Sequence, residues 1–154
     1  MTVTDTMPPP SPFPDLGIDG LVGFHIRLAS AVVYQQFTQI CGDLGLTQKQ
    51  VAILWLIEEQ PGIAQADIGR RLKMDRASVM AVINRLQDRK LLKRGVSEQD
   101  RRRQTLTLTQ AGCEALVQAR ARIAAHEDWL KARFSPAESA MLVELLQRIH
   151  GDRS

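Results

Sequence analysis

The segment from Met74 to Thr109 reads MDRASVMAVINRLQDRKLLKRGVSEQDRRRQTLTLT and decides the fold. Its first half carries apolar residues at i, i+4 and i+7, a spacing that places side chains on one face of a helix. These residues are Val79, Ile83 and Leu86. Asp75 precedes them as a favourable N-cap, so the sequence predicts a helix that runs from Asp75 to about Lys90.

The second half of the segment predicts a β-hairpin. Leu91-Leu92 begins a strand that ends near Gly95, and Gln104–Leu108 alternates polar and apolar residues like a half-exposed strand. Between them, Val96–Arg103 is a hydrophilic loop that contains three adjacent arginines. A hairpin directly after such a helix is a wing.

A shorter helix is predicted just before this segment, from Gln65 to Leu72. The side chains expected to face inward are Ala66, Ile68 and Leu72. The turn Lys73–Asp75 joins this helix to the next one. Two short helices connected by a tight turn, the second with an exposed polar N-terminal face, form a helix-turn-helix.

The charge of the chain is unevenly distributed. Its 154 residues are 44% hydrophobic and 24% charged, typical values for a globular protein, with a net charge of +3. Two basic and six acidic residues give −4 over residues 1–63, whereas twelve basic and five acidic residues give +7 over residues 64–110. Basic charge concentrated on the predicted helix-turn-helix and wing indicates a polyanionic partner, the alternative being a solvated basic surface.

Several function classes find no support in the sequence. No apolar run approaches the roughly 20 residues of a membrane span, and no secretory leader is recognisable. Cys41 and Cys113 lack a metal-ligand spacing, which favours a reduced, cytoplasmic protein with no metal or other cofactor. Phosphate loops, HExxH and nucleophile elbows are absent, and residues 126–128 (HED) are interpreted as a solvated helical patch. We therefore expect no enzymatic activity.

The rest of the chain predicts further helices and a tail. Residues 1–16 hold five of the seven prolines and are expected to be disordered. Residues 17–45 contain an apolar helix from about Ile18 to Cys41, residues 46–109 the winged helix-turn-helix, and residues 110–154 two more helices. The fold class is mainly α, with about six helices and a small β-hairpin wing. Because the N- and C-terminal helices carry more apolar surface than one compact core needs, we expect them to dimerise.

The order and spacing of these motifs closely resemble the MarR family of winged-helix transcription regulators. The resemblance covers residues 46–112 and rests on LTQKQVAIL, ADIGRRLKMDRASV, NRL, LLKR, the DRR of residues 100–102 and LTQAG. It implies a homodimer that binds an imperfect palindrome in double-stranded DNA, usually as a repressor of its own or a neighbouring operon. The chain departs from the family pattern at Lys90, where glycine is usual and a different C-cap is therefore expected. It also departs at Met80-Ala81, where relatives often have Thr-Arg.

The second helix of the pair is expected to read bases in the major groove. Arg76, Ala77 and Ser78 lie in its first turn, where backbone donors and the helix dipole favour phosphate or base edges. Arg76 is suited to guanine, and Ser78 to a base or a phosphate. Met80 or Ala81 is expected to contact a thymine methyl group.

Other predicted contacts fix the protein on the DNA backbone. Arg85 is expected to contact a phosphate or to form an internal ion pair, while Gln65 and Lys73 set the register. The wing-tip arginines suit a narrow minor groove. They are Arg101, Arg102 and Arg103. The resemblance singles out Arg102 for that groove and Asp100 as the residue that orients the wing, the alternative for Asp100 being a simple turn former.

The resemblance also implies a small effector, such as an aromatic acid or a coenzyme A thioester, that shifts the population toward a form unable to bind DNA. The candidate contacts are His25, Arg27, Tyr34 and Trp55. An arginine can pair with a carboxylate and aromatic side chains can enclose a ring, although core roles are the alternative for the aromatics. Two other functions stay open: a redox sensor that uses Cys41 or Cys113, although both positions are expected to be buried and inert, and a winged-helix module that binds protein.

Overall fold

The computed structural model describes residues 17–151, so the predicted tail at residues 1–16 lies outside it. The chain divides into two compact units, one ending at Gln35 and one beginning at Gln36. The elements, in order, are η1 (Ile18–Gly20), α1 (Val22–Cys41), η2 (Gly42–Leu44), α2 (Gln48–Glu59), α3 (Gln65–Leu72), α4 (Arg76–Asp88), β1 (Leu92–Val96), β2 (Gln104–Leu108), α5 (Gln110–Lys131) and α6 (Pro136–His150). No helix in the described part is long and apolar enough to cross a membrane.

The first unit consists of η1 and the greater part of α1. The predicted helix start at Ile18 is instead a 3-10 turn, and Leu21 is extended before α1 begins at Val22. Leu28 and Val32 on α1 are both exposed. The apolar surface expected from the sequence is therefore present on this helix.

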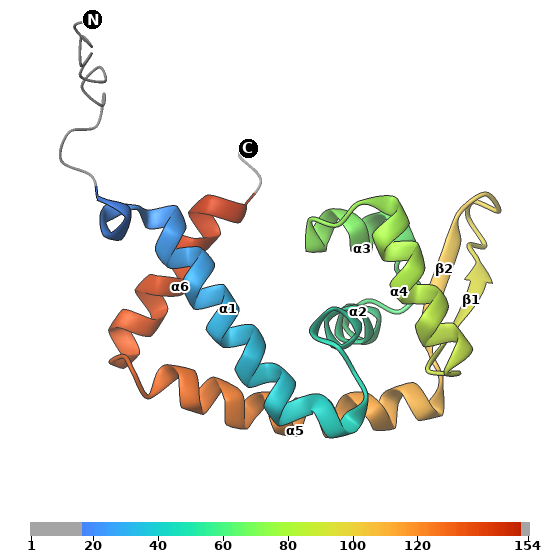
Figure 1. Cartoon of the computed structure of the whole chain (residues 1–154). Helices are drawn as coiled ribbons and strands as arrows, with labels where there is room; N and C mark the ends of the chain where they lie inside the picture. The colour runs from blue at the N-terminus through green and yellow to red at the C-terminus, as the bar shows by residue number, and fades with distance from the viewer. Residues whose placement is uncertain (1–16, 152–154) are drawn as a thin grey trace, which may run out of the picture. The chain divides into compact units, whose positions relative to one another are not determined.

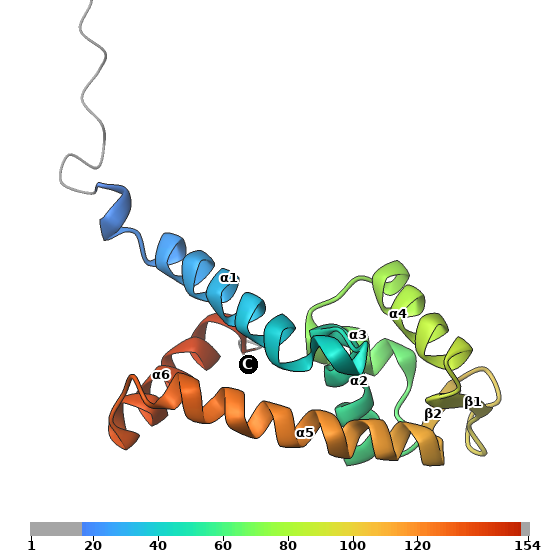
Figure 2. The same ribbon diagram turned by 60° about the horizontal axis from the view of Figure 1, so that its bottom comes forward.

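Helix α2 lies at the centre of the second unit, with α3, α4, the hairpin and α5 arranged around it (Figures 1 and 2). Each of these elements contributes fully buried side chains. The largest are Ile53, Leu54, Ile57, Ile68, Ile83, Leu86, Leu92, Leu106 and Leu116. Each such burial stabilises the fold by roughly 1.5–3 kcal/mol, so the core holds α4 and the hairpin in fixed positions. This arrangement is the winged helix-turn-helix that the sequence predicted.

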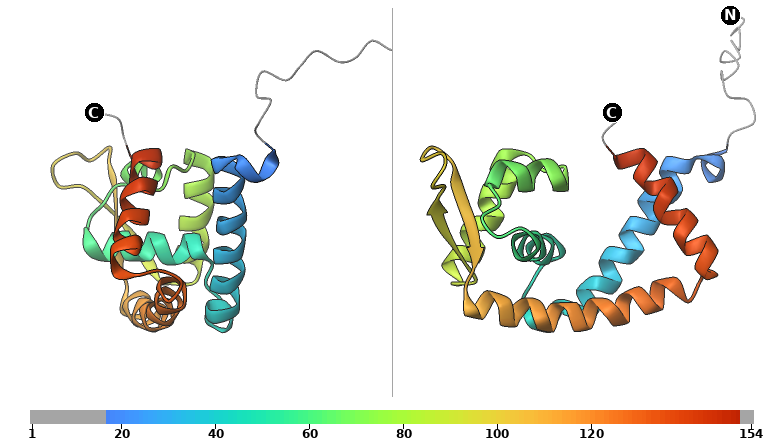
Figure 3. Two further views of the ribbon diagram at one scale, coloured as in Figure 1. Left: turned by 90° about the vertical axis from the view of Figure 1, so that its left-hand side faces the viewer. Right: turned by 180° about the vertical axis from the view of Figure 1, so that it is seen from behind.

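The hairpin is anchored to the core on its inner side. Strands β1 and β2 are antiparallel, with Leu92 opposite Leu108 and Val96 opposite Gln104. The backbone of Leu106 in β2 also bonds to the segment between α2 and α3, where its N–H reaches the Ile63 carbonyl at 3.1 Å. The inner end of the hairpin is therefore fixed to the core, and its loop extends beside α4 (Figure 3).

The end of α4 differs from the expectation for Lys90. Lys90 has a φ of +58°, in the left-handed region that glycine usually occupies. The Lys90 N–H bonds to the Gln87 carbonyl at 2.8 Å, and the Leu91 N–H bonds to the Leu86 carbonyl at 3.0 Å. This is the Schellman C-cap, formed at the steric cost of a lysine side chain. The prediction of a different cap was wrong.

The helix α5 begins in close contact with the residue before β1. Thr109 caps α5 by accepting from the Gly112 N–H at 3.0 Å, and its own N–H bonds to the Leu91 carbonyl at 3.1 Å. A Cβ on Gly112 would lie 1.9 Å from that carbonyl oxygen. Only glycine allows α5 to start this close to the hairpin.

Candidate nucleic-acid interface

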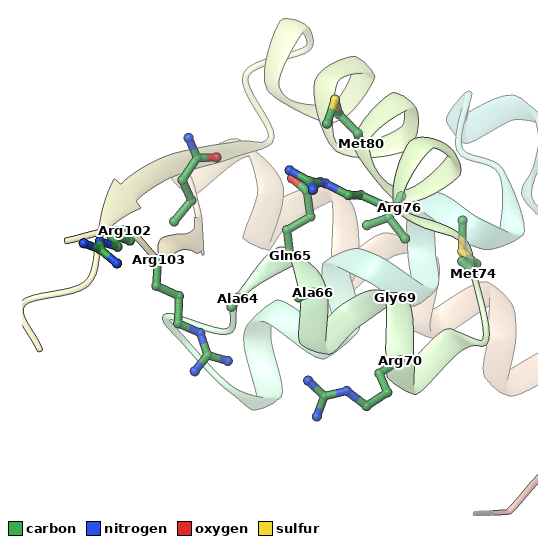
Figure 4. A pocket seen from close by; sticks show the side chains of 12 residues that line it. Ala64, Gln65, Ala66, Gly69, Arg70, Met74, Arg76, Met80, Arg102 and Arg103 are labelled. Atoms are coloured by element: carbon green, nitrogen blue, oxygen red, sulfur yellow. The ribbon is translucent and has the colours of Figure 1, made fainter. Parts of the chain in front are cut away.

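A groove of about 830 Å³ opens between α3, the first turns of α4 and the end of the wing (Figure 4). It brings together residues that are far apart in sequence. Its lining is Ala64, Gln65, Ala66, Gly69, Arg70, Met74, Arg76, Val79, Met80, Arg102, Arg103 and Gln104. Ala66, predicted to face inward, is exposed here instead, because Ile68 and Gly69 supply the buried face of α3.

The N-terminus of α4 is held in shape by Asp75 and Ser78. The Asp75 carboxylate accepts from the Ser78 N–H at 2.8 Å and from the Ser78 hydroxyl at 2.6 Å. Both hydrogen bonds lower the pKa of Asp75 below its ordinary value. The hydroxyl proton of Ser78, a predicted DNA contact, is therefore directed to the N-cap, and Ser78 is half-buried.

The outward face of α4 carries the other predicted contacts. The residues Arg76, Ala77, Met80, Ala81 and Arg85 are all exposed. The Arg76 side chain extends across the groove toward Gln65, at the start of α3 (Figure 4). Arg85 has no ion-pair partner among residues 17–151, so the internal pair considered from the sequence does not form there.

Sequence reasoning missed Arg94, which connects the wing to α4. From β1, its guanidinium donates to the side-chain oxygen Oδ1 of Asn84 at 2.6 Å and also to the side-chain oxygen of Gln87. Its Nε is buried without a partner. Arg94 thereby uses the side-chain oxygens of both amides on the second half of α4. The LLKR motif placed an arginine in the strand, but the sequence did not indicate its direction.

The wing loop is organised by two short polar side chains. Ser97 Oγ accepts from the Asp100 N–H at 3.2 Å, and Asp100 Oδ1 accepts from the Arg102 N–H at 3.0 Å. The Asp100 carbonyl also accepts from the Arg103 N–H at 2.9 Å. Asp100 is thus a turn former whose bonds fix the backbone that carries the arginines.

The three wing arginines have different surroundings. Arg103 is ion-paired with Asp67 of α3, and Asp67 also holds Arg70 at 2.8 Å. The side chains of Arg101 and Arg102 are exposed and make no hydrogen bond or ion pair within residues 17–151. Two guanidinium groups therefore remain available to an external anion at the wing tip.

The predicted register residues lie at the two ends of α3. Gln65 begins the helix and lines the groove. Lys73 ends the helix in the left-handed region, with a φ of +53°, and its side chain is exposed. Gln65 therefore shares the groove with Arg76, whereas Lys73 is not part of its lining.

The predicted effector residues fall in separate units. On α1, His25 Nε2 lies 2.7 Å from the Asp19 carbonyl, Arg27 lies over the Phe24 ring, and Tyr34 is exposed. Trp55, in the second unit, is half-buried under Arg120, whose guanidinium carbon lies 4.4 Å from the ring centroid.

A buried histidine was misjudged from the sequence. His126 was predicted to be solvated, but it is only 5% exposed and its Nε2 has no hydrogen-bond partner. Its ring stacks on the Trp129 ring, with the two centroids 5.6 Å apart. It also makes a T-shaped contact with the Phe37 ring, with the centroids 6.4 Å apart. The helical spacing of His126 and Leu116 was the available signal, since both lie on the inner side of α5.

The two cysteines also differ from each other. Cys41 is fully buried, and burial raises the pKa of its thiol. Cys113, which was expected to be buried, is exposed. No group of metal-ligating side chains occurs in the described residues.

Comparison with known proteins gives concordant results. A family profile described as "MarR family" matches residues 44–103. A putative transcriptional regulatory protein for the hcr operon of Thauera aromatica is 32% identical over 132 residues, which cover 85% of this chain and 80% of that protein.

Two solved structures have a similar fold. The transcriptional repressor CouR bound to a 23-mer DNA duplex is 29% identical, with a TM-score of 0.81 over 88% of this chain and 98% of that one. Bordetella bronchiseptica BpsR, whose DNA binding is regulated by 6-hydroxynicotinic acid, is 27% identical, with a TM-score of 0.84 over 90% of this chain and 99% of BpsR.

Proposed function

This chain belongs to the MarR family of winged-helix transcription regulators, and we propose that it represses a catabolic or efflux operon from a palindromic operator until a small aromatic effector releases it. The operon is its own or a neighbouring one. The observation that carries this proposal is the groove between α4 and the wing, where Arg76 and Arg102 line one continuous concave surface.

The charges around this groove support DNA as its ligand. Arg76 stands at the N-terminus of α4, where the helix dipole adds to its positive charge. Arg101 and Arg102 extend from a loop whose backbone is fixed by Asp100. A helix that reads the major groove and basic side chains that enter the adjacent minor groove require this relative placement.

The proposal includes a homodimer that reads two half-sites. Helix α6 begins with a capping box at Ser135 and presents a continuous exposed apolar stripe. The stripe contains Met141, Leu142, Leu145, Leu146 and Ile149, and Val143 beside it is also exposed. Because a monomer rarely leaves so much apolar side-chain surface in contact with water, we propose that α1 and α6 pair with a second copy.

The effector part of the proposal draws on two observations. BpsR, a similar regulator, responds to an aromatic acid. In this chain, the buried His126 Nε2 has no hydrogen-bond partner, and the His126 ring lies against those of Phe37 and Trp129. A buried polar atom among aromatic rings is suited to a ligand that has a ring and one polar substituent. His25, Arg27, Tyr34 and Trp55 remain the other candidate contacts.

The test is capture of genomic fragments by the full-length chain, followed by anisotropy titration of the captured duplex with aromatic acids and their coenzyme A thioesters. We expect saturable binding that an effector weakens, with a change in tryptophan fluorescence that His126→Ala abolishes. Failure to enrich any fragment would refute the proposal. Binding that is insensitive to salt would instead favour a protein-binding module, and release by peroxide alone would favour a thiol sensor.

A further inference from the structure

We propose that Met80 is a specificity-determining residue of α4 that contacts the C5 methyl group of a thymine one or two base pairs from the base read by Arg76. The inference rests on the proposed DNA-binding function and specifies what the centre of the interface recognises. Met80 and Ala81 were both candidates on sequence grounds, and the structure separates them.

Met80 lies inside the groove, on the same face of α4 as Arg76. Its side chain is 39% exposed, and it lines the groove together with Arg76 and Arg102. Ala81 is exposed but does not line the groove. In Figure 4, Met80 stands one turn above Arg76 and points away from the buried side of the helix. Met80 is therefore a large, exposed apolar group that α4 presents to this groove.

The amides of α4 are poorly placed to read adenine. An asparagine or glutamine reads adenine with its oxygen and its NH2 group together. The Asn84 oxygen accepts from Arg94 at 2.6 Å, and the Gln87 oxygen also accepts from Arg94. Because Arg94 holds both oxygens toward the wing, turning either amide onto adenine would weaken its bond to Arg94. The apolar side chains of α4 are therefore better placed than these amides to contact an A·T pair.

The chemistry of the major groove indicates what an apolar side chain contacts there. The C5 methyl of thymine is the apolar group that base pairs present in that groove. Met80 is unbranched and polarizable, so its side chain can adjust to a methyl at a range of positions. Burying one methyl-sized group is worth about 0.8 kcal/mol, or about a fourfold change in affinity.

The spacing of the two residues locates the thymine. Arg76 and Met80 are four residues apart, which is about 6 Å along a helix axis. Successive bases are about 3.4 Å apart along one strand. Two side chains on one face of α4 therefore reach positions one or two base pairs apart. The half-site should contain a guanine with a T·A pair at that distance.

The experiment combines in vitro selection with deletion of a single methyl group. The full-length chain selects its half-site from a random duplex pool, and each selected thymine is then replaced by deoxyuridine. Affinities are measured by anisotropy for the wild type, Met80→Ala and Met80→Leu, with thermal unfolding as the control for folding. Since Met80 is exposed, both variants should retain the unfolding temperature of the wild type.

We expect one thymine, one or two base pairs from a selected guanine, at which deoxyuridine weakens wild-type binding about fourfold. Met80→Ala should lose this discrimination and Met80→Leu should retain it. Selection of a half-site with no such thymine, or an equal deoxyuridine penalty in the wild type and Met80→Ala, would overturn the inference alone. Enrichment of no sequence would refute the proposed function itself.

Discussion

Arg103 at the end of the wing loop is ion-paired with Asp67 of α3, whose carboxylate also holds Arg70. The pair joins the wing to the first helix of the helix-turn-helix across 36 residues of sequence. It partly neutralises one of the three adjacent arginines and leaves Arg101 and Arg102 to meet an external anion. The three arginines, alike in sequence, should therefore contribute differently to binding.

Arg102→Ala should weaken DNA binding strongly and reduce its salt dependence, whereas Arg103→Ala should leave that dependence nearly unchanged. Each phosphate contact contributes about 0.9 to the slope of log K against log salt concentration. Removal of a guanidinium that is available to DNA should therefore lower the slope by about 1. Anisotropy titrations at several salt concentrations measure this slope. Equal slope changes in the two variants would contradict the different roles of Arg102 and Arg103.

Asp67→Asn should have the opposite effect. Without the carboxylate, Arg70 and Arg103 are both released beside the groove, and a negative charge that repels phosphate is removed. We expect tighter binding to unrelated DNA and a slope that is steeper by about 1 for each released guanidinium that contacts a phosphate. Glu98→Gln, on the exposed wing loop, is a control for loss of one negative charge nearby. An identical response in both variants would mean that the ion pair has no role.

Lys90→Gly should stabilise the protein. The backbone of Lys90 is already in the left-handed region, at a cost that glycine does not incur, of about 1 kcal/mol. In a chain of this size, the gain should raise the unfolding temperature by about 3 °C. Lys49→Gly, at an exposed position in the first turn of α2, is the matched control and should lower it. Calorimetry that shows destabilisation by Lys90→Gly would contradict the C-cap geometry.

Gly112→Ala should be strongly destabilising, because the new Cβ would lie 1.9 Å from the Leu91 carbonyl oxygen. Separating α5 from the hairpin to relieve this overlap should cost about 3 kcal/mol. Gly42→Ala, which would meet nothing within 4 Å, is the control. Urea denaturation should show a much lower free energy of unfolding for Gly112→Ala and little change for Gly42→Ala. Similar curves for the two variants would refute the close approach.

Acid should lower the free energy of unfolding, because it breaks the ion pair between Arg122 of α5 and Asp43 of η2. Arg122 donates to the two carboxylate oxygens at 2.9 and 2.7 Å, which holds the pKa of Asp43 below its ordinary value of 3.8. A carboxyl with a depressed folded-state pKa stabilises the fold above its unfolded pKa. That contribution is lost as the pH falls through the folded value.

The free energy of unfolding should therefore decline as the pH falls below about 4. Both Asp43→Asn and Arg122→Met should make this decline shallower, because the first removes the carboxyl and the second removes the main cause of its lowered pKa. Urea denaturation at a series of pH values measures the effect. A decline as steep in the two variants as in the wild type would show that this pair does not contribute.

The sequence predicted the elements well because local signals define them. Thr47, Asp75, Thr109 and Ser135 are all N-caps in the structure, and the periodic apolar residues of α4 are buried. The alternation in Gln104–Leu108 likewise marked the second strand of the wing. These features depend on neighbouring residues alone.

Predictions that depended on distant partners were less successful. Nothing near Arg94 indicates that it turns toward Asn84, and nothing near Arg103 indicates Asp67, since both pairs form only when the hairpin packs beside the helices. His126 was predicted wrongly because its charged neighbours in sequence suggested exposure, whereas its side chain lies on the buried side of α5. The left-handed Lys90 was missed because residue preference is a weaker constraint than the packing of Leu91.

The central claim is that α4 and the wing bind DNA sequence-specifically. Its most direct test is the affinity of the full-length chain, by anisotropy at one salt concentration, for a captured genomic duplex and for the same duplex with its sequence scrambled. We expect a Kd of about 10⁻⁸ M or tighter for the captured duplex, at least about 1000-fold below that for the scrambled one, and loss of this preference in Arg76→Ala. Equal affinity for the two duplexes would contradict the claim.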